Sequence, residues 1–373
     1  MTDMLATERH GLLVKELEAS GVLKITELAA RLGVSRATIR RDLMDLEAAG
    51  LVTRVRGGAV LAASEAVERS AGVAGVAGAA TEPTAGTGPQ VLGLLVPAAT
   101  HYYPSVVAGV RAVAATRGAR VVISLTDYAQ TRDLDALDEL NASSATGLLI
   151  ASADGHHPPR GALDRLRARG LPFVLLERQP DDGFAPSEFV ASDHRQGAFA
   201  AVRHLVNLGH DKVGLFTNGG PTAPLIREGY EAAVRLLPLA PSSPAVDSGS
   251  PVLGSTRAAA TYDRFLAECR ATGTRAALVH SDHDAIELMR RMRAQGLGVP
   301  DDLALVAYED EIASLADVPL TAVAPYKREL GEEAARLLLD RLASPAPGAV
   351  PVRQLFLQPR LVVRASCGAA DRL

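Results

Sequence analysis

Short apolar runs alternate with longer amphipathic stretches from residue 90 onward. Seven runs have the length and composition of buried strands: Leu92–Val96, Val121–Leu125, Gly147–Ile150, Phe173–Leu176, Val213–Phe216, Ala276–Val279 and Leu303–Ala307. Helices are predicted near residues 105–117, 131–143, 161–169, 196–208, 225–237, 256–271 and 284–295. Alternating strands and helices indicate parallel sheets joined by right-handed crossovers. Because about 280 residues exceed a single core, the pattern predicts two lobes.

The chain before residue 90 has two segments of different amino-acid composition. Residues 1–61 mix charges with helical periodicity, whereas residues 62–89 consist mostly of Ala, Gly, Thr and Ser without aromatic side chains. The second composition is typical of a flexible linker. Farther along, the Pro- and Ser-rich stretch 238–251 predicts a surface loop. The sequence therefore predicts domains at 1–61 and 90–366, joined by the linker.

Residues 22–60 have the pattern of a small helical module. Thr26 and Ser35 can each cap a short helix, and Gly33 gives a turn between the two helices. On the second helix Ile39 and Leu43 fall on one apolar stripe, which leaves the arginines of that helix on other faces. Two short helices with a tight turn fit helix-turn-helix docking in a DNA major groove.

A short strand pair is predicted directly after these helices. Residues 51–58 alternate apolar and basic side chains and end in a Gly57-Gly58 turn, which predicts a β-wing bearing Arg54 and Arg56. From residue 31 to residue 56 six basic residues face three acidic ones, a net charge of +3 within a chain of −4, so the remainder carries −7. A focused basic patch favours nucleic acid. An ordinary amphipathic helix pair with a solvated charged face is the alternative.

The same segment resembles, nearly end to end, the helix-turn-helix of DeoR-type transcription regulators. The matching residues are Leu28-Ala29, Val34-Ser35, Thr38-Ile39-Arg40-Arg41-Asp42-Leu43, Leu46-Glu47, Gly50 and Gly57-Gly58. The resemblance implies that Arg36, Ala37, Thr38, Arg40 and Arg41 face DNA. The full set of predicted DNA-binding residues adds Thr26, Ser35, Arg54 and Arg56.

Polar and aromatic side chains follow the predicted strands of the C-terminal domain. Ligands bind beyond the carboxyl ends of parallel strands, where carboxylates and arginines can bind vicinal hydroxyls and tyrosines can stack on sugar rings. Each such residue can instead cap a helix or form a surface ion pair. The predicted effector-binding residues are His101, Tyr103, Asp127, Glu177, Arg178, Arg227, Ser281, Asp282 and Glu309.

The C-terminal domain resembles the effector-binding core of the LacI/GalR repressor family, which has a periplasmic-binding-protein-like fold. The markers, in order, are Ser192-Asp193, Leu208-Gly209-His210, Tyr308-Glu309-Asp310, Pro319-Leu320-Thr321 and Leu330-Gly331. The resemblance implies an α/β domain of two lobes with parallel sheets, approximately 90–190 plus 326–350 and 191–325 plus 351–366. It also implies an effector bound between the lobes, with Glu177 or Arg178, Arg227, Ser281 or Asp282, and Glu309 at effector-contacting positions.

Two departures from the family pattern bear on ligand and coupling. Glu309 stands where the family commonly has Asp, and Ser281 where Asn is frequent, so a different ligand preference is expected. No hinge-helix sequence follows the DNA-binding module, because residues 62–89 have linker composition instead.

Metal and cofactor chemistry are not favoured by the sequence. The run His280-Ser281-Asp282-His283-Asp284 contains metal-binding residue types, but at a strand end entering a helix their side chains diverge, so a structural or effector-binding role is expected. Two cysteines, Cys269 and Cys367, form no metal-binding cluster and are consistent with a reducing compartment. No cofactor is predicted. The N-terminus lacks the apolar core of a signal peptide, which predicts a cytoplasmic protein.

Together these patterns predict an N-terminal winged helix-turn-helix plus a two-lobed α/β periplasmic-binding-protein-like domain. The predicted function is a homodimeric, ligand-responsive regulator that represses a carbohydrate-utilisation operon, with an operator DNA and a small sugar as partners and no membrane association. The alternative is a Rossmann-like enzyme acting on a sugar or another small polar substrate. No dinucleotide-binding glycine pattern follows Leu92–Val96, which argues against it. A transport binding protein shares the fold, but the DNA-binding module argues against export.

Overall fold

The computed structural model divides the chain into two compact units. The first comprises residues 1–153, 159–174 and 331–351, and the second comprises 154–158, 175–330 and 352–373. The residues that the structure describes are 13, 22–24, 38–39, 42–43, 52–55, 58–61, 90–98, 100–126, 136, 140, 144–152, 155, 157–158, 160–168, 170–182, 184, 186–240, 243–252, 254–344 and 350–369.

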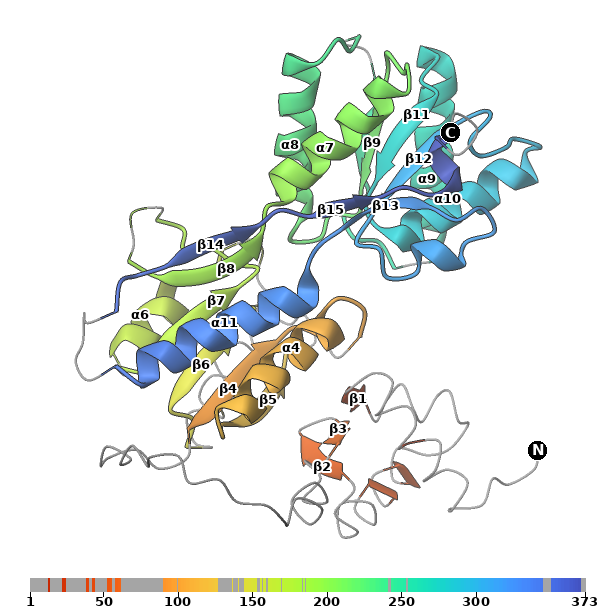
Figure 1. Cartoon of the computed structure of the whole chain (residues 1–373). Helices are drawn as coiled ribbons and strands as arrows, with labels where there is room; N and C mark the ends of the chain where they lie inside the picture. Colours follow the sequence, from red (N-terminus) through yellow and green to blue (C-terminus); the bar gives the residue numbers. More distant parts are fainter. Residues whose placement is uncertain are drawn as a thin grey trace, which may run out of the picture. The chain divides into compact units, whose positions relative to one another are not determined.

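A small antiparallel sheet lies in the N-terminal segment (Figure 1). Strands β1 (Val22–Lys24), β2 (Val52–Val55) and β3 (Gly58–Leu61) pair in the order β1-β3-β2. The β2–β3 hairpin confirms the predicted wing, but Gly58, which was predicted to lie in the turn, begins β3 and pairs with Val55. Strand β1 was not predicted. Ile39 and Leu43 are helical and fully buried, as their shared apolar stripe predicts.

One six-stranded sheet has the order β14-β8-β7-β6-β4-β5. Its strands are β4 (Val91–Val96), β5 (Arg120–Leu125), β6 (Gly147–Ile150), β7 (Phe173–Leu176), β8 (Glu188–Ser192) and β14 (Gln354–Leu357). Strand β4 pairs in parallel with β5 and β6, and β14 pairs in parallel with β8. Three helices accompany this sheet in the chain order: α4 (Tyr103–Thr116) follows β4, α6 (Arg160–Ala168) follows β6, and α11 (Lys327–Leu342) precedes β14.

The other six-stranded sheet has the order β10-β9-β11-β12-β13-β15. Its strands are β9 (Gly214–Thr217), β10 (Ala245–Asp247), β11 (Ala276–Val279), β12 (Ala304–Tyr308), β13 (Thr321–Ala324) and β15 (Arg360–Val362). Every pairing is parallel except that of β13 with β15. Its helices are α7 (His194–Asn207), α8 (Ala223–Leu236), α9 (Thr256–Thr272) and α10 (Asp282–Ala294).

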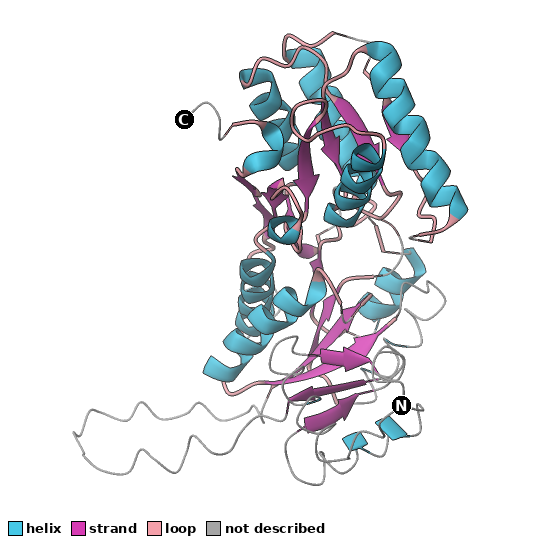
Figure 2. Ribbon diagram, turned by 90° about the vertical axis from the view of Figure 1, so that its right-hand side faces the viewer, coloured by secondary structure: helices cyan, strands magenta, loops and turns pink. Residues whose placement is uncertain are grey.

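Strand residues of this second sheet alternate between two hydrophobic cores, one on each face. Ala277 and Val279 pack with α9 and α10, while Ala276 and Leu278 pack with α7 and α8. Figure 2 shows helices on both faces of the strands. Burial on both faces explains why β11 is a continuous apolar run rather than an alternating one. The parallel α/β architecture predicted from the sequence is confirmed.

Several elements were not predicted, and one region was predicted wrongly. The stretch 238–251 contains β10, in which Val246 is buried and pairs in parallel with Phe216, so it is not entirely a surface loop. Its three-residue pattern is too short to read without the neighbouring strand. Strands β8, β13, β14 and β15 were also missed. The helix predicted at 131–143 lies largely outside the described residues.

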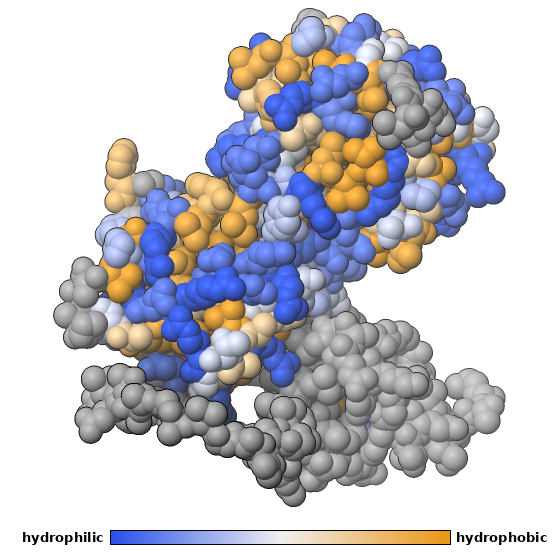
Figure 3. Space-filling model, viewed as in Figure 1, coloured by the Kyte–Doolittle hydropathy of each residue, from blue (hydrophilic) through white to orange (hydrophobic). Residues whose placement is uncertain are grey.

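The described surface mixes polar and apolar side chains, as Figure 3 shows for one face. Phe184, Val252 and Leu315 are the most exposed large apolar side chains of the described part. Across that same part, no helix combines the length and apolar character that crossing a membrane requires.

Candidate effector site and DNA-binding module

The predicted DNA-binding residues lie in a segment that the structure describes only in part. Thr38 is helical and half-buried, and Arg54 belongs to strand β2. The others lie outside the described residues: Thr26, Ser35, Arg36, Ala37, Arg40, Arg41 and Arg56. Their contacts with DNA stay predictions.

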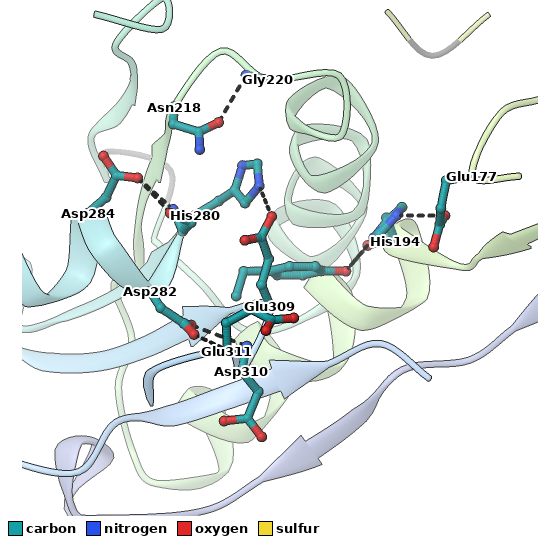
Figure 4. Close-up of polar contacts among 12 residues, drawn as sticks. Glu177, His194, Asn218, Gly220, His280, Asp282, Asp284, Glu309, Asp310 and Glu311 are labelled. Carbon is teal, nitrogen blue, oxygen red and sulfur yellow. Dashed lines mark hydrogen bonds and ion pairs between the residues drawn. The ribbon is translucent and has the colours of Figure 1, made fainter. Parts of the chain in front are cut away.

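Three polar side chains follow neighbouring parallel strands of the second sheet. Asn218 comes directly after β9, His280 after β11 and Glu309 after β12, and these strands are adjacent in the order β9-β11-β12. The backbone N–H of His280 donates to the carbonyl of Phe216 at 2.9 Å, which ties the end of β11 to β9. The three residues therefore form a row along the carboxyl edge, as Figure 4 shows.

Glu309 is held by a histidine and a lysine. Its Oε1 lies 3.3 Å from Nε2 of His280, and its backbone carbonyl accepts a hydrogen bond of 2.5 Å from Nζ of Lys327. Lys327 also pairs with Glu311. Burial raises the pKa of Glu309, but the hydrogen bond and charge of His280 and the charge of Lys327 outweigh it and lower this pKa below its ordinary value. Glu309 is thus held as a carboxylate.

Asp282 anchors the loop that follows Glu309. Its carboxylate accepts hydrogen bonds from the backbone N–H groups of Asp310, Glu311 and Ile312, at 3.3, 2.6 and 3.0 Å. Burial raises the pKa of Asp282 to about 6; the charge of Glu309 adds to this rise and the three N–H groups oppose it. Asp282 was predicted as an effector contact, and the structure shows its carboxylate bound to the protein's own backbone.

Ser281 is the N-cap of helix α10 and forms a capping box with Asp284. The backbone N–H and the hydroxyl of Ser281 donate to Oδ2 of Asp284 at 2.8 and 3.0 Å, and the hydroxyl of Tyr262 donates to Oδ1 at 2.7 Å. Helix capping was the alternative role for this residue, and the geometry shows that role. That Ser281 also contacts an effector stays a prediction.

Side chains of the His280–Asp284 run diverge from one another. His280 contacts Glu309, Asp282 contacts the 310–312 backbone and Asp284 contacts Tyr262. Among the described residues, no three His, Cys, Asp or Glu side chains converge in a way that could hold a metal ion. This divergence agrees with the side-chain directions predicted at the strand end.

Glu177 lies in a second polar cluster, at the end of β7. Its Oε1 accepts a 2.7 Å hydrogen bond from the hydroxyl of Ser192, and its Oε2 accepts one of 2.9 Å from the Ser192 N–H. Nε2 of His194 lies 3.3 Å from Oε2. The other ring nitrogen of His194 is 3.1 Å from the hydroxyl of Tyr308. Figure 4 shows Glu177 and His194 pointing toward each other.

The remaining predicted effector residues are dispersed. Arg178 is buried and donates to the carbonyl of Glu177 at 3.0 Å, and Arg227 is half-buried on α8. Tyr103 begins α4 and is buried, whereas His101 is exposed. Asp127 lies outside the described residues. The structure therefore brings Ser281, Asp282 and Glu309 together at one sheet edge, and places Glu177 and Arg178 side by side at the end of β7.

Two residues of these clusters, Asn218 and His194, escaped the sequence prediction. A signal existed for Asn218, because it is polar and follows the predicted strand Val213–Phe216. No comparable signal existed for His194, whose role depends on contacts with Glu177 and Tyr308 from distant parts of the chain.

Two family models match the chain. A DeoR-like helix-turn-helix domain matches residues 9–65, and a periplasmic binding protein-like domain matches residues 202–367. Both resemblances expected from the sequence are confirmed.

Curated relatives span most of the chain. The arabinose metabolism transcriptional repressor of Geobacillus stearothermophilus is 25% identical over 91% of this chain and 89% of that protein. The ribose operon repressor of Escherichia coli K12 is 28% identical over 74% and 82%. The transcriptional regulator MalR of Streptomyces coelicolor is 28% identical over 93% and 97%.

Solved structures share the fold of the C-terminal domain. The transcription regulator GntR from Chromobacterium violaceum matches 74% of this chain and 99% of its own, at 25% identity and a TM-score of 0.63. A LacI family regulator from Enterococcus faecium, solved with ribose, matches 74% and 98% at 22% identity and a TM-score of 0.60.

Proposed function

With a DeoR-like helix-turn-helix domain joined to a periplasmic-binding-protein-like domain, the chain is a ligand-responsive, DNA-binding transcriptional regulator, and we propose that it represses a carbohydrate-utilisation operon as a homodimer. The observation that carries the proposal is this pairing in one chain of a module that reads DNA and a domain whose fold binds small ligands. The domain boundaries stay predictions, as does the place of the effector between two lobes.

The relatives support a sugar as the effector. The Geobacillus and Escherichia proteins are named repressors of arabinose metabolism and of a ribose operon, and both align with most of this chain. These regulators also favour a binding function over the alternative of a Rossmann-like enzyme. Because an operator is the partner, we propose that the protein works in the cytoplasm.

The chemistry at the carboxyl edge of the second sheet is consistent with a polyhydroxylated ligand. Glu309 offers a carboxylate whose side chain is 24% exposed, and carboxylates accept short, charge-assisted hydrogen bonds from hydroxyl groups. Asn218 adds a side-chain amide from the adjacent strand end. Arg227, on α8, is a further predicted effector contact, which we propose adds a guanidinium that can bind hydroxyls.

The DNA end of the proposal depends on a basic segment and on dimer symmetry. The hairpin β2–β3 contains Arg54, and residues 31–56 carry a net charge of +3. In a homodimer two recognition helices would meet two half-sites about 34 Å apart. Because phosphate contacts release counterions, affinity for the operator should fall steeply with salt.

A gel shift with the adjacent promoter region tests the proposal. The full chain should retard this DNA in preference to random DNA of equal length, and one sugar of a panel containing L-arabinose, D-ribose and maltose should change the affinity. Equal binding of promoter and random DNA would contradict the regulatory function. Promoter binding that no sugar changes would contradict the sugar effector alone.

A charge-reversal variant tests whether DNA binding and effector binding are functions of separate domains. Arg41→Glu should abolish the gel shift while the sugar-induced rise in thermal stability persists, because the two functions lie in separate domains. Arg69→Glu, in the predicted linker, is the matched control and should leave both signals in place. Loss of both signals in a folded Arg41→Glu protein would contradict the separation.

A further inference from the structure

His280 and Glu309 form an unequal pair at the carboxyl edge of the second sheet. The imidazole of His280 is 3% exposed, whereas the Glu309 side chain is 24% exposed. Only Oε1 of Glu309 contacts His280, at 3.3 Å, and Oε2 has no hydrogen-bond partner among the residues that the structure describes. The histidine is therefore the buried support of the pair, and the carboxylate is its accessible end.

The backbone around Glu309 is fixed from two sides. Lys327 donates to the carbonyl of Glu309, and Asp282 accepts the next three backbone N–H groups. Glu309 and Asp310 have φ values of 102° and 55°, a region that residues with side chains seldom adopt. These contacts fix the position of the Glu309 backbone, but they do not fix the side-chain torsions that place its carboxylate.

The side-chain torsions of Glu309 are restrained by His280. A glutamate has three rotatable side-chain bonds, and each staggered torsion has several accessible wells. The hydrogen bond from Nε2 of His280 selects the rotamers that keep Oε1 beside the imidazole. Pre-organising the carboxylate in this way removes part of the ordering cost that ligand binding would otherwise carry.

Most other charges around this carboxylate are paired. Lys327 pairs with Glu311, and Arg364 pairs with Asp310 through its two terminal nitrogens at 2.7 and 3.2 Å. Among the described residues His280 is therefore the ion-pair partner printed for the Glu309 carboxylate, and Lys327 and His194 act on it only through the longer-range field of their charges. A carboxylate of this kind attracts hydroxyl donors and repels a second anion.

From this geometry we infer that His280 is a positioning residue for the effector: it orients the Glu309 carboxylate so that Oε2 binds hydroxyl groups of an uncharged sugar and rejects the phosphorylated or oxidised form of that sugar. The inference rests on the proposed function and makes it more specific, because it names the charge class of the ligand. His280 itself acts through Glu309.

Matched pairs of neutral and anionic sugars test this inference. We would titrate the full chain by calorimetry at pH 8, where an ordinary histidine is neutral, with D-ribose and D-ribose 5-phosphate, L-arabinose and L-arabinonate, and D-glucose and D-glucose 6-phosphate. At least one neutral sugar should bind about 100-fold more tightly than its anionic partner. Glu309→Gln should bring the two members of that pair to within about threefold of each other, since it removes the charge and keeps the shape.

Three histidine variants isolate the positioning role. His280→Phe should weaken binding of the neutral sugar about tenfold, whereas His280→Gln should restore it, because the amide nitrogen of Gln can occupy the place of Nε2. His210→Phe is the matched control, because His210 precedes the amino end of β9, at the opposite edge of the sheet. This variant should bind the neutral sugar as tightly as the wild type does. Rescue by His280→Gln keeps the test decisive even where His280→Phe folds poorly.

Each contrary outcome has a separate meaning. Tighter binding of an anionic partner by the wild type, through Arg227 for instance, would overturn the inference and leave the sugar-responsive function intact. Equal affinity of wild type, His280→Phe and His280→Gln for the neutral sugar would overturn the role of His280. If no sugar of either class bound the wild type, the proposed sugar effector and this inference would both fall.

Discussion

Two glutamates in the second unit, Glu177 and Glu309, share the same local geometry but differ in how far their carboxylates are buried and bonded. Each follows a parallel strand, each has a positive φ, at 53° and 102°, and each lies 3.3 Å from a histidine Nε2. The Glu177 side chain is 5% exposed and both of its oxygens are occupied by Ser192 and His194. That of Glu309 is 24% exposed and one oxygen is occupied.

The difference comes from what the neighbouring strand supplies. Strand β8 brings both the N–H and the hydroxyl of Ser192 to Glu177, so this carboxylate is satisfied inside the protein. No equivalent donor reaches Oε2 of Glu309 from the described residues. A buried, fully bonded carboxylate stabilises the fold, whereas a half-bonded and accessible one is available for a ligand. The comparison predicts opposite consequences for stability and for binding.

The largest effect is expected from removing the buried carboxylate. Glu177→Ala should lower the free energy of unfolding by about 3–5 kcal/mol, because it leaves His194 and the Ser192 N–H without their acceptor in a buried site. Urea unfolding would measure it. The exposed Glu228, 52% accessible in its side chain, is the control, and Glu228→Ala should change stability by less than about 0.5 kcal/mol. Equal effects of the two variants would break the comparison.

Asp282, which anchors the Glu309 loop, should give a pH-dependent effect. Its pKa is raised from the ordinary 3.8 to about 6, so the native state holds the proton more tightly than the unfolded state. Stability from this group is complete below pH 3.8 and is lost as the pH rises through 6. Relative to Asp282→Asn, the wild type should therefore lose up to about 3 kcal/mol between pH 4 and 8. Urea unfolding of both proteins over this pH range would measure the loss. A difference in unfolding free energy between the two proteins that stays constant with pH would contradict the prediction.

A smaller effect is expected at Tyr308, which lies near both glutamates. Its hydroxyl contacts Nδ1 of His194, and burial together with the charges of Glu177, Asp193 and Glu309 raises its pKa well above the ordinary value. Tyr308→Phe should destabilise the protein by about 1 kcal/mol, because a buried hydrogen bond is lost. Thermal unfolding would measure it, with Tyr326→Phe as an exposed control. A neutral result would show that the Glu177 cluster does not depend on this hydroxyl.

The smallest change in stability is expected at Glu309. Glu309→Gln should lower the free energy of unfolding by less than about 1 kcal/mol, since its backbone contact with Lys327 remains and its side chain is partly exposed. The same urea series used for Glu177→Ala gives the measurement. A loss as large as that of Glu177→Ala would mean that both carboxylates are structural.

Much of the fold followed from local pattern. The apolar runs at β4, β6, β11 and β12 are long enough and buried enough on both faces to be read as strands, and the intervening helices have clear amphipathic periods. The edge strands β10, β14 and β15 were missed, because three or four residues of mixed polarity acquire strand geometry only from the strand beside them.

The sequence by itself determined the architecture, the DNA-reading module and the position of polar residues at the strand ends, since these depend on periodicity and on motifs within short segments. It assigned Glu177, Asp282 and Glu309 the same role, because all three are carboxylates after strands. Only the tertiary structure separated them. Glu177 contacts Ser192, 15 positions away; Asp282 contacts the 310–312 backbone, 28–30 positions away; and Glu309 contacts His280, 29 positions away. Such distant partners decide whether a carboxylate is satisfied inside the protein or left available to a ligand.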